Sequence, residues 1–213
     1  NTVFSSIDYN GRYAYSNQPS IAKWNLERFA ESLIPLVDKD RDIALKIVIK
    51  ILKDFAKKYK KSWIEMMKKK LGLLGEDSKD EQLIIELLSW MHHNKADYTN
   101  TFCHLMGELK IEKEIYNEQQ FIDWRHRWEI RCKINNNSLQ KSEVLMKKAN
   151  PLVIPRNHFV EESIDAFTEN NDLTKIYKLL NVIKNQDIKK SEISSYQDFS
   201  TSKDKDYKTF CGT

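Results

Sequence analysis

The histidine and cysteine side chains of this 213-residue sequence are densest between residues 92 and 104. Imidazole and thiolate groups are ligands that Zn²⁺ prefers, so a metal centre would use His92, His93, Cys103 and His104. Adjacent helical residues point about 100° apart, so neither neighbouring pair can hold one ion, and no second pair completes a tetrahedral set. We therefore predict core and helix-terminal residues here, and no bound metal.

General acid–base catalysis would need carboxyl groups in an apolar environment that raises their pKa. The paired carboxylates Asp80-Glu81 and Glu161-Glu162 fall in helical turns that we expect to be solvated. The sequence has no Gly-x-Ser-x-Gly elbow, and Gly72 and Gly75 stand beside leucines without the basic partner of a phosphate-binding loop. The residues themselves predict no catalytic group.

Two arginines, Arg12 and Arg156, each lie in a segment without helical periodicity, next to Gly or Asn. A planar guanidinium in such a place can bind a carboxylate or a phosphate. The other interpretation is an ion pair that joins a loop to a helix, and it is favoured because loop arginines more often organise a fold.

Lysines recur at spacings of three and four along a helix predicted from about residue 42 to residue 61: Lys46, Lys50, Lys53, Lys57 and Lys60. Such a stripe could dock an acidic partner. A solvated face is the favoured interpretation, because no aromatic residues are interleaved with the lysines. The net charge of +4 also gives no reason to expect nucleic-acid binding.

The elements around these residues are predicted to be helical, because five glycines and four prolines are few for strand-connecting turns. An extended segment is expected up to Pro19, because Tyr13 and Tyr15 alternate with polar neighbours. Ser20 should cap the first helix. Further helix starts are predicted from four signals: a connection at Pro35 and residues 38–40, the capping-box pair Ser78 and Glu81, Asp97, and Ser138. Gly72 is expected to end a helix in the left-handed conformation.

The predicted organisation is an extended segment over residues 1–20, a helical domain over residues 21–185 and an irregular tail over residues 186–213. The three cysteines, Cys103, Cys132 and Cys211, have no metal-type spacing, which favours a reducing, cytoplasmic compartment over a disulfide framework. No run approaches about 18 apolar residues, and no signal peptide is recognisable, so no membrane association is expected.

Several short motifs occur in a fixed order along the chain: residues 3–8, Gly11-Arg-Tyr-Ala-Tyr, Asn17-Gln-Pro, Trp24-Asn-Leu, Lys70-Leu-Gly, Ala96-Asp-Tyr-Thr, Asn150-Pro, Arg156-Asn-His and a terminal Cys-Gly-Thr. As an ordered set they resemble the C-terminal part of the selenoprotein O (SelO) family over nearly the whole chain. The motif residues singled out are Gly11, Arg12, Tyr13, Asn17, Gln18, Pro19, Trp24, Arg156, Asn157 and His158.

The resemblance implies an atypical protein-kinase fold, described as a pseudokinase, that transfers AMP from ATP to protein hydroxyls with Mg²⁺. It places the nucleotide-binding, metal-holding and catalytic residues upstream of Asn1. The present residues would then be the end of an activation-type segment and a helical C-lobe, without an ATP site, that supports the N-terminal half and protein substrates. We also expect that the chain begins partway through a longer protein.

Cys211 resembles the redox-active residue that the family carries near its C-terminus. Many relatives have a cysteine where this chain has Phe4, and that cysteine has been linked to the terminal residue. With its family partner missing, Cys211 is expected to be a free regulatory thiol or to pair elsewhere.

Overall fold

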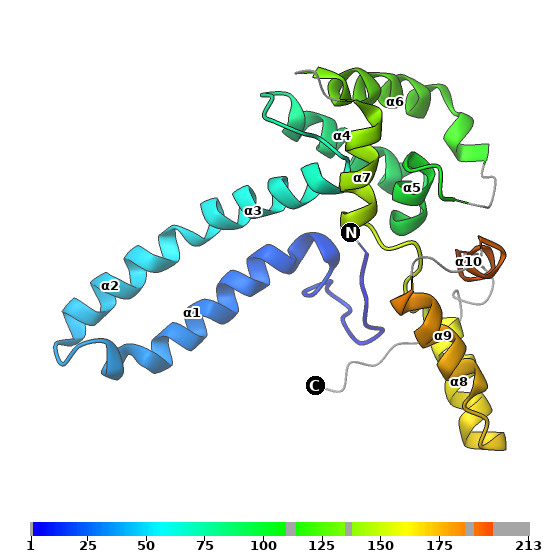
Figure 1. Cartoon of the computed structure of the whole chain (residues 1–213). Helices are drawn as coiled ribbons and strands as arrows, with labels where there is room; N and C mark the ends of the chain where they lie inside the picture. The colour runs from blue at the N-terminus through cyan, green and yellow to red at the C-terminus, as the bar shows by residue number, and fades with distance from the viewer. Residues whose placement is uncertain (1, 110–113, 135–137, 186–189, 198–213) are drawn as a thin grey trace. The chain divides into compact units, whose positions relative to one another are not determined.

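The computed structural model describes residues 2–109, 114–134, 138–185 and 190–197, and Figure 1 shows that these residues form helices and connecting turns. No β-strand occurs in these ranges, which confirms the all-α class. The described residues divide into two compact units, residues 2–65 and residues 66–197, and the division falls inside a helix. The boundaries predicted at residues 20 and 185 stay predictions. Within the same ranges, no helix has both the length and the apolar character needed to cross a membrane.

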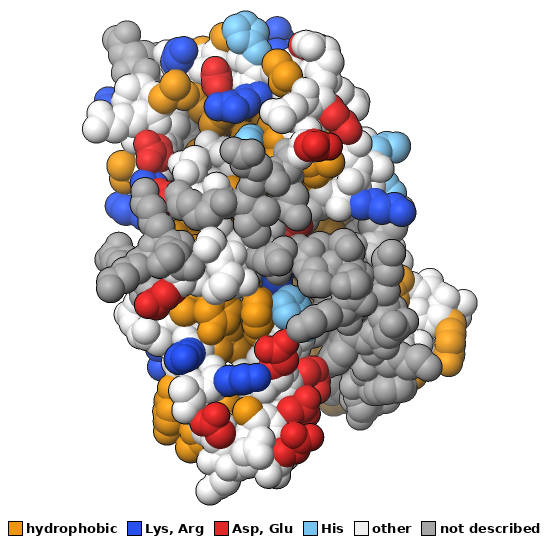
Figure 2. Space-filling model, turned by 90° about the vertical axis from the view of Figure 1, so that its right-hand side faces the viewer, with side chains coloured by type: hydrophobic (Ala, Val, Ile, Leu, Met, Phe, Trp, Pro, Cys, Tyr) orange, Lys and Arg blue, Asp and Glu red, His pale blue; other side chains and the backbone are white. Residues whose placement is uncertain are grey.

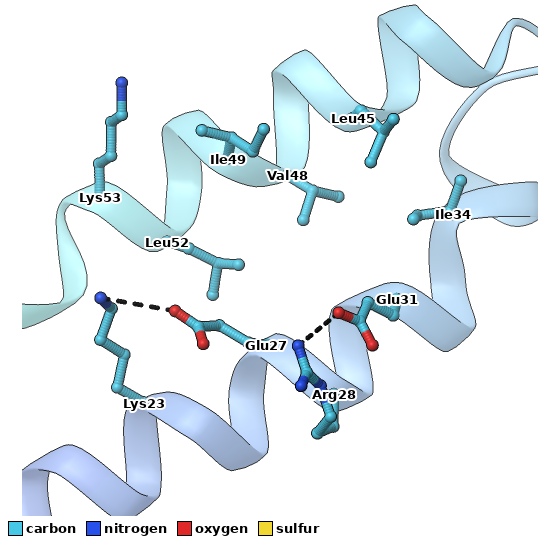
Figure 3. Close-up of a pocket in the computed structure, with 10 residues that line it drawn as sticks. All are labelled: Lys23, Glu27, Arg28, Glu31, Ile34, Leu45, Val48, Ile49, Leu52 and Lys53. Carbon is cyan, nitrogen blue, oxygen red and sulfur yellow. Dashed lines mark hydrogen bonds and ion pairs between the residues drawn. The ribbon is translucent and has the colours of Figure 1, made fainter.

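The first unit contains α1 (Gln18–Val37), α2 (Arg41–Lys53) and the beginning of α3 (Phe55–Lys70). Helices α1 and α2 lie side by side (Figures 1 and 3). Asp40 caps α2, because its carboxylate accepts hydrogen bonds from two backbone N–H groups of the first turn. Pro35 lies inside α1 and not in the connection as predicted, since its missing N–H costs only one bond in the last turn.

The helix predicted over residues 42–61 is divided into α2 and α3 at Asp54. The backbone N–H of Asp54 donates to the carbonyl oxygen of Ile51 at 3.3 Å, an i→i−3 bond that tightens the chain locally. The predicted periodicity is therefore right in type, but it spans two helices.

Few apolar side chains of the first unit are buried. Among its described residues only Ala14 and Ala44 reach that state, with exposed fractions of 4% and 0%. Large apolar side chains stay exposed on both helices, for example Phe29 at 61%, Leu36 at 82% and Ile51 at 63%. The first unit therefore does not close a hydrophobic core from its own described residues.

The second unit has a well-packed core formed by α4 (Asp80–His93), α5 (Tyr98–Leu105), a short 3₁₀ helix (Glu114–Asn117), α6 (Gln119–Cys132) and α7 (Leu139–Ala149). At its centre the ring of Phe121, which is fully buried, lies 4.5 Å from that of Trp90. Its fully buried apolar side chains include Met67, Leu71, Ile84, Leu87, Phe102 and Met146. Two predicted helix starts are confirmed, because Asp97 caps α5 and Ser138 caps α7.

The turn after α3, residues 71–75, is held by side chains from distant helices. Gly72 has a φ of +67°, which confirms its predicted left-handed conformation. Trp128 Nε1 donates to the carbonyl oxygen of Leu71 at 2.8 Å, and Arg131 Nη1 donates to that of Leu74 at 3.1 Å. Asn150 Nδ2 donates to the carbonyl oxygen of Lys70 at 2.8 Å, just before the turn.

Asp80 is buried and ion-paired, which corrects two predictions. Helix α4 begins at Asp80 and has Lys79, not Ser78, at its N-cap, and Asp80 is not solvated but 3% exposed. Its carboxylate accepts from Arg131 Nε at 2.6 Å and lies 3.2 Å from Lys68 Nζ. Burial raises the pKa of Asp80, but the hydrogen bonds from Arg131 and Lys68 outweigh it and leave that pKa below its ordinary value.

The chain continues into a hairpin of α8 (Asn157–Asn170) and α9 (Thr174–Lys184) and then α10 (Lys190–Gln197). Figure 2 shows acidic and hydrophobic side chains next to each other at the lower end of the visible face, where Figure 1 places α8 and α9. Helix α10 lies in the tail that we expected to be irregular. It is held because Ile193 packs with Val153 and Val182, a long-range contact that local periodicity does not reveal.

Candidate functional site

Residues 5–17, which precede α1, form four successive turns. Backbone N–H groups of Asp8, Gly11, Ala14 and Asn17 each donate to the carbonyl oxygen three residues earlier, at distances from 2.9 to 3.1 Å. Gly11 has a φ of +63°, a conformation that glycine adopts without strain. The prediction of an extended segment is therefore wrong, because these local hydrogen bonds replace the pairing partner that an extended chain would need.

Polar side chains fix these turns from within. The carboxylate of Asp8 accepts hydrogen bonds from the backbone N–H groups of Arg12 and Tyr13, both at 2.8 Å. Asn17 Nδ2 donates to the carbonyl oxygen of Gly11 at 2.6 Å, and Gln18 Nε2 donates to that of Tyr13 at 2.7 Å. The predicted motif residues of this segment thus lie together and stabilise one backbone conformation.

Helix α1 starts directly after these turns, at Gln18, with Pro19 in its first turn. Ser20 lies inside the helix and is not its cap, because the last turn of the preceding segment already continues into helical geometry. One turn further along, Trp24 lies beside the turn segment, 4.6 Å from the Arg12 guanidinium carbon to the centre of its ring. The Arg28 guanidinium carbon lies 5.4 Å from the same ring centre.

Next to Trp24 the surface has a hollow of about 360 Å³, lined by Arg12, Asn17, Ser20, Ile21 and Trp24. We call these five residues the Arg12–Trp24 surface. Trp24 is 42% exposed, so its indole is accessible from solvent. The sequence singled out three of the five, and it missed Ser20 and Ile21 as lining residues because their facing depends on where α1 begins.

A second hollow, of about 280 Å³, lies between α1 and α2 (Figure 3). In Figure 3 the side of α1 carries charged residues that pair with each other, Lys23 with Glu27 at 3.4 Å and Arg28 with Glu31. The α2 side contributes the apolar residues Leu45, Val48, Ile49 and Leu52, and also Lys53. Because Glu31 neutralises Arg28, that arginine adds little net charge beside Trp24.

The other predicted arginine, Arg156, lies in the second unit and forms an internal ion pair. Its Nη1 and Nη2 atoms donate to the Asp97 carboxylate at 2.8 and 3.0 Å, and Arg156 is 8% exposed. Asn100 Nδ2 donates to the carbonyl oxygen of Gln197 at 2.8 Å, which joins α10 to the same cluster. Of the two interpretations of Arg156, the structure therefore shows the ion pair.

Asn157 and His158, the remaining motif residues, are the first two residues of α8. The His158 ring lies 4.0 Å from that of Phe159. These two residues and Arg156 follow Pro155 directly in sequence, and in the structure they mark the start of one helix.

The former metal candidates do not converge. Within the described ranges, no three side chains among His, Cys, Asp and Glu are close enough to hold an ion. Cys103 and Cys132 are buried, and burial raises the pKa of the Cys103 thiol to about 12. His104 stacks on Tyr116 with ring centres 4.0 Å apart. Cys211 lies outside the described residues.

His104 should make the stability of the second unit depend on pH. Burial, with a smaller effect of Arg125, lowers its pKa to about 4. The unfolded chain binds this proton near pH 6.5 and the folded chain does not, so stability should fall as pH drops from about 6.5 towards 4. Replacing His104 with Phe should reduce the loss between pH 7.5 and 5 by about 1 kcal/mol, allowing for partial exposure of the ring.

Urea unfolding of both proteins at the two pH values, followed by far-UV circular dichroism, measures this difference. Phe keeps a ring for the stack on Tyr116, which limits any packing defect. A packing defect would in any case lower stability equally at both pH values. Equal pH dependence in the two proteins would contradict the assignment.

Comparison with known proteins identifies relatives that match the whole length of this chain. A family model described as "Protein adenylyltransferase SelO" matches residues 2–184. The chain is 46% identical over 212 residues to the "Protein nucleotidyltransferase YdiU" of Pelagibacter ubique, covering 100% of this chain and 44% of that protein. It is 44% identical to the protein of the same name from Alcanivorax borkumensis, again covering 100% of this chain and 44% of the relative.

A third relative with this name, from Nitrosococcus oceani, is 42% identical, and the match covers 100% of this chain and 43% of the relative. The chain thus spans less than half the length of the curated relatives that it matches.

Proposed function

The chain belongs to the SelO family of protein adenylyltransferases, and we propose that it is the C-terminal part of an enzyme that transfers AMP from ATP to Ser, Thr or Tyr hydroxyls of proteins. The observation that carries this proposal is the family match over residues 2–184, together with relatives named as protein nucleotidyltransferases. In this proposal the described helices form the C-lobe of a kinase-like fold. The enzyme would act in the cytoplasm.

ATP and Mg²⁺ are assigned to the other half of the parent protein. Magnesium requires carboxylate or phosphate oxygens that are free to coordinate it. The buried carboxylate of Asp80 and the partly buried carboxylate of Asp97 are already engaged by Arg131 and Arg156, so these groups do not fit a magnesium site. This half of the enzyme would therefore act as a scaffold, and AMP transfer would depend on positioning by both halves.

The first unit supports such a scaffold role. Its exposed apolar side chains, such as Leu36 and Ile51, would be covered by the N-terminal, ATP-binding half of the same protein. The turn segment before α1, fixed by Asp8, Asn17 and Gln18, would face the protein substrate.

The 213-residue chain alone should show no AMP transfer. In this proposal the residues that hold Mg²⁺ and ATP lie in the other half, and without bound Mg²⁺ and ATP no phosphoryl-type transfer can be positioned. The measurement is incubation with α-labelled ATP and protein acceptors. The control is a longer protein in which this chain replaces the matching region of the Pelagibacter ubique relative, which should label the acceptors. Label transferred by the 213-residue chain would contradict the scaffold assignment.

A second candidate function is a helical interaction module that docks an acidic partner. The five lysines of the stripe, at positions 46, 50, 53, 57 and 60, are all exposed on α2 and α3. Binding through lysines weakens steeply with ionic strength, whereas an apolar interface between enzyme halves tolerates salt. Salt dependence of complex formation therefore separates the two functions.

A further inference from the structure

Among the residues that the structure describes, no acid forms an ion pair with the guanidinium of Arg12. Asp8 is the nearest acid in sequence, but its two carboxylate oxygens accept the backbone N–H groups of Arg12 and Tyr13. Among the described residues, the guanidinium itself contacts only the rings of Tyr13 and Trp24. Arg28, the other guanidinium beside Trp24, is neutralised by Glu31. Within the described ranges, the Arg12 guanidinium therefore has no ion-pair partner.

The surroundings of Arg12 are rigid and contain further donors. The side-chain bonds of Asp8, Asn17 and Gln18 fix the backbone on both sides of Arg12. Ser20 and Asn17 also line the hollow beside it, and Asn17 Nδ2 already donates to the carbonyl oxygen of Gly11. A planar guanidinium fork matches the planar geometry of a carboxylate, and the fixed backbone reduces the ordering that is needed when the ligand binds.

The charge at this surface selects among possible ligands. A phosphate monoester carries nearly two negative charges, and one unpaired guanidinium balances a single charge. Two guanidinium groups lie within 5.4 Å of the Trp24 ring centre, so a nucleobase that stacks on this ring would compete with them. A single carboxylate fits both the charge and the planar donors.

We propose that the Arg12–Trp24 surface binds an Asp or Glu side chain of the acceptor protein. This assignment rests on the proposed transferase function and gives it a substrate class, namely acceptor segments with an acidic side chain. Tyr13, which is 50% exposed, offers an apolar contact to the rest of such a segment.

The test is a titration of the ¹⁵N-labelled 213-residue chain with a peptide whose only charge is one glutamate, acetyl-Gly-Ser-Glu-Gly-amide. The Trp24 indole N–H and Arg12 Nε–H signals should shift and saturate at millimolar peptide. A peptide with glutamine in place of glutamate should bind about tenfold more weakly, because it loses a charge-assisted bidentate pair. The variant Arg12→Gln should bind both peptides alike.

Arg12→Lys should show intermediate discrimination, since it keeps the charge and loses the fork. Lys53→Gln removes a cation that lines the other hollow, between α1 and α2, and should bind like the unmodified chain. In the described part of the chain the Arg12 guanidinium makes no hydrogen bond. Unchanged signals elsewhere will show that Arg12→Gln is folded.

Three results would overturn the proposal: equal binding of the glutamate and glutamine peptides, undiminished discrimination by Arg12→Gln, or tighter binding of inorganic phosphate than of the glutamate peptide. The titration does not involve ATP. A chain that discriminates the peptides, in a protein that never transfers AMP, would reject the proposed function and keep the carboxylate site. Labelling of acceptors without peptide discrimination would keep the proposed function and reject the carboxylate site.

Discussion

Replacing Gly72 with alanine is expected to lower the free energy of unfolding of the second unit by about 3 kcal/mol or more. Gly72 has a φ of +67°, where any other residue is strained. A Cβ atom there would lie 2.6 Å from the backbone oxygen of Ser142 and 3.0 Å from Met146 Cγ. Since the backbone of α7 cannot move aside cheaply, strain and overpacking add. Urea unfolding followed by tryptophan fluorescence measures the loss.

Gly107 provides a matched control for this prediction. Its φ is +70°, but a Cβ atom there would meet nothing within 4 Å. Gly107→Ala should therefore show the backbone strain alone, about 1 kcal/mol. Equal losses at the two positions would mean that the contact with α7 contributes nothing.

Replacing Arg131 with methionine is expected to destabilise the second unit by about 3–5 kcal/mol, because it leaves a buried carboxylate without its main partner. Arg131 and Asp80 are 6% and 3% exposed, and two hydrogen bonds of 2.6 and 3.0 Å join them. The substitution also removes the donor to the carbonyl oxygen of Leu74. Thermal and urea unfolding both measure the effect.

The same helix contains a control pair. Arg125 and Glu129 lie 3.0 Å apart, and their side chains are 47% and 32% exposed, so Arg125→Met should cost about 0.5 kcal/mol. Adding Asp80→Asn to Arg131→Met should recover part of the loss, because the buried charge disappears. If Arg131→Met behaves like Arg125→Met, then the buried pair does not stabilise the fold.

This pair also predicts a response to acid. Because the pKa of Asp80 lies below its ordinary value in the folded protein, the carboxylate stabilises the fold above about pH 4. That contribution is lost as pH falls through the folded-state pKa. The protein with Arg131→Met should lose less stability over that range.

Local sequence signals predicted much of the helical framework. The caps at Asp97 and Ser138 and the left-handed Gly72 depend on residues a few positions apart, so they can be predicted from the local sequence. The start of α4 could not be predicted in this way. The capping-box spacing at Ser78 is present, but the buried pairing of Asp80 with Arg131, 51 residues away, determines where the helix begins.

In the candidate site, too, contacts between residues close in sequence could be predicted and contacts between distant residues could not. Gly11, Arg12, Asn17 and Gln18 come together because hydrogen bonds over four to six residues fold that segment. Asp97 and Gln197 were missed beside Arg156, because those contacts join residues far apart in the chain. For the same reason α10 could not be predicted from a tail that has no apolar period.

The turn at residues 71–75 has a consequence for how tolerance to substitution is distributed over the chain. Backbone carbonyl oxygens are the same in every amino acid, so the acceptors at Lys70, Leu71 and Leu74 survive almost any replacement of those side chains. The donors Asn150, Trp128 and Arg131 have no such freedom. In a family-wide survey, the residue type should therefore vary little at the three remote donor positions. Within the turn itself it should vary freely, except at Gly72.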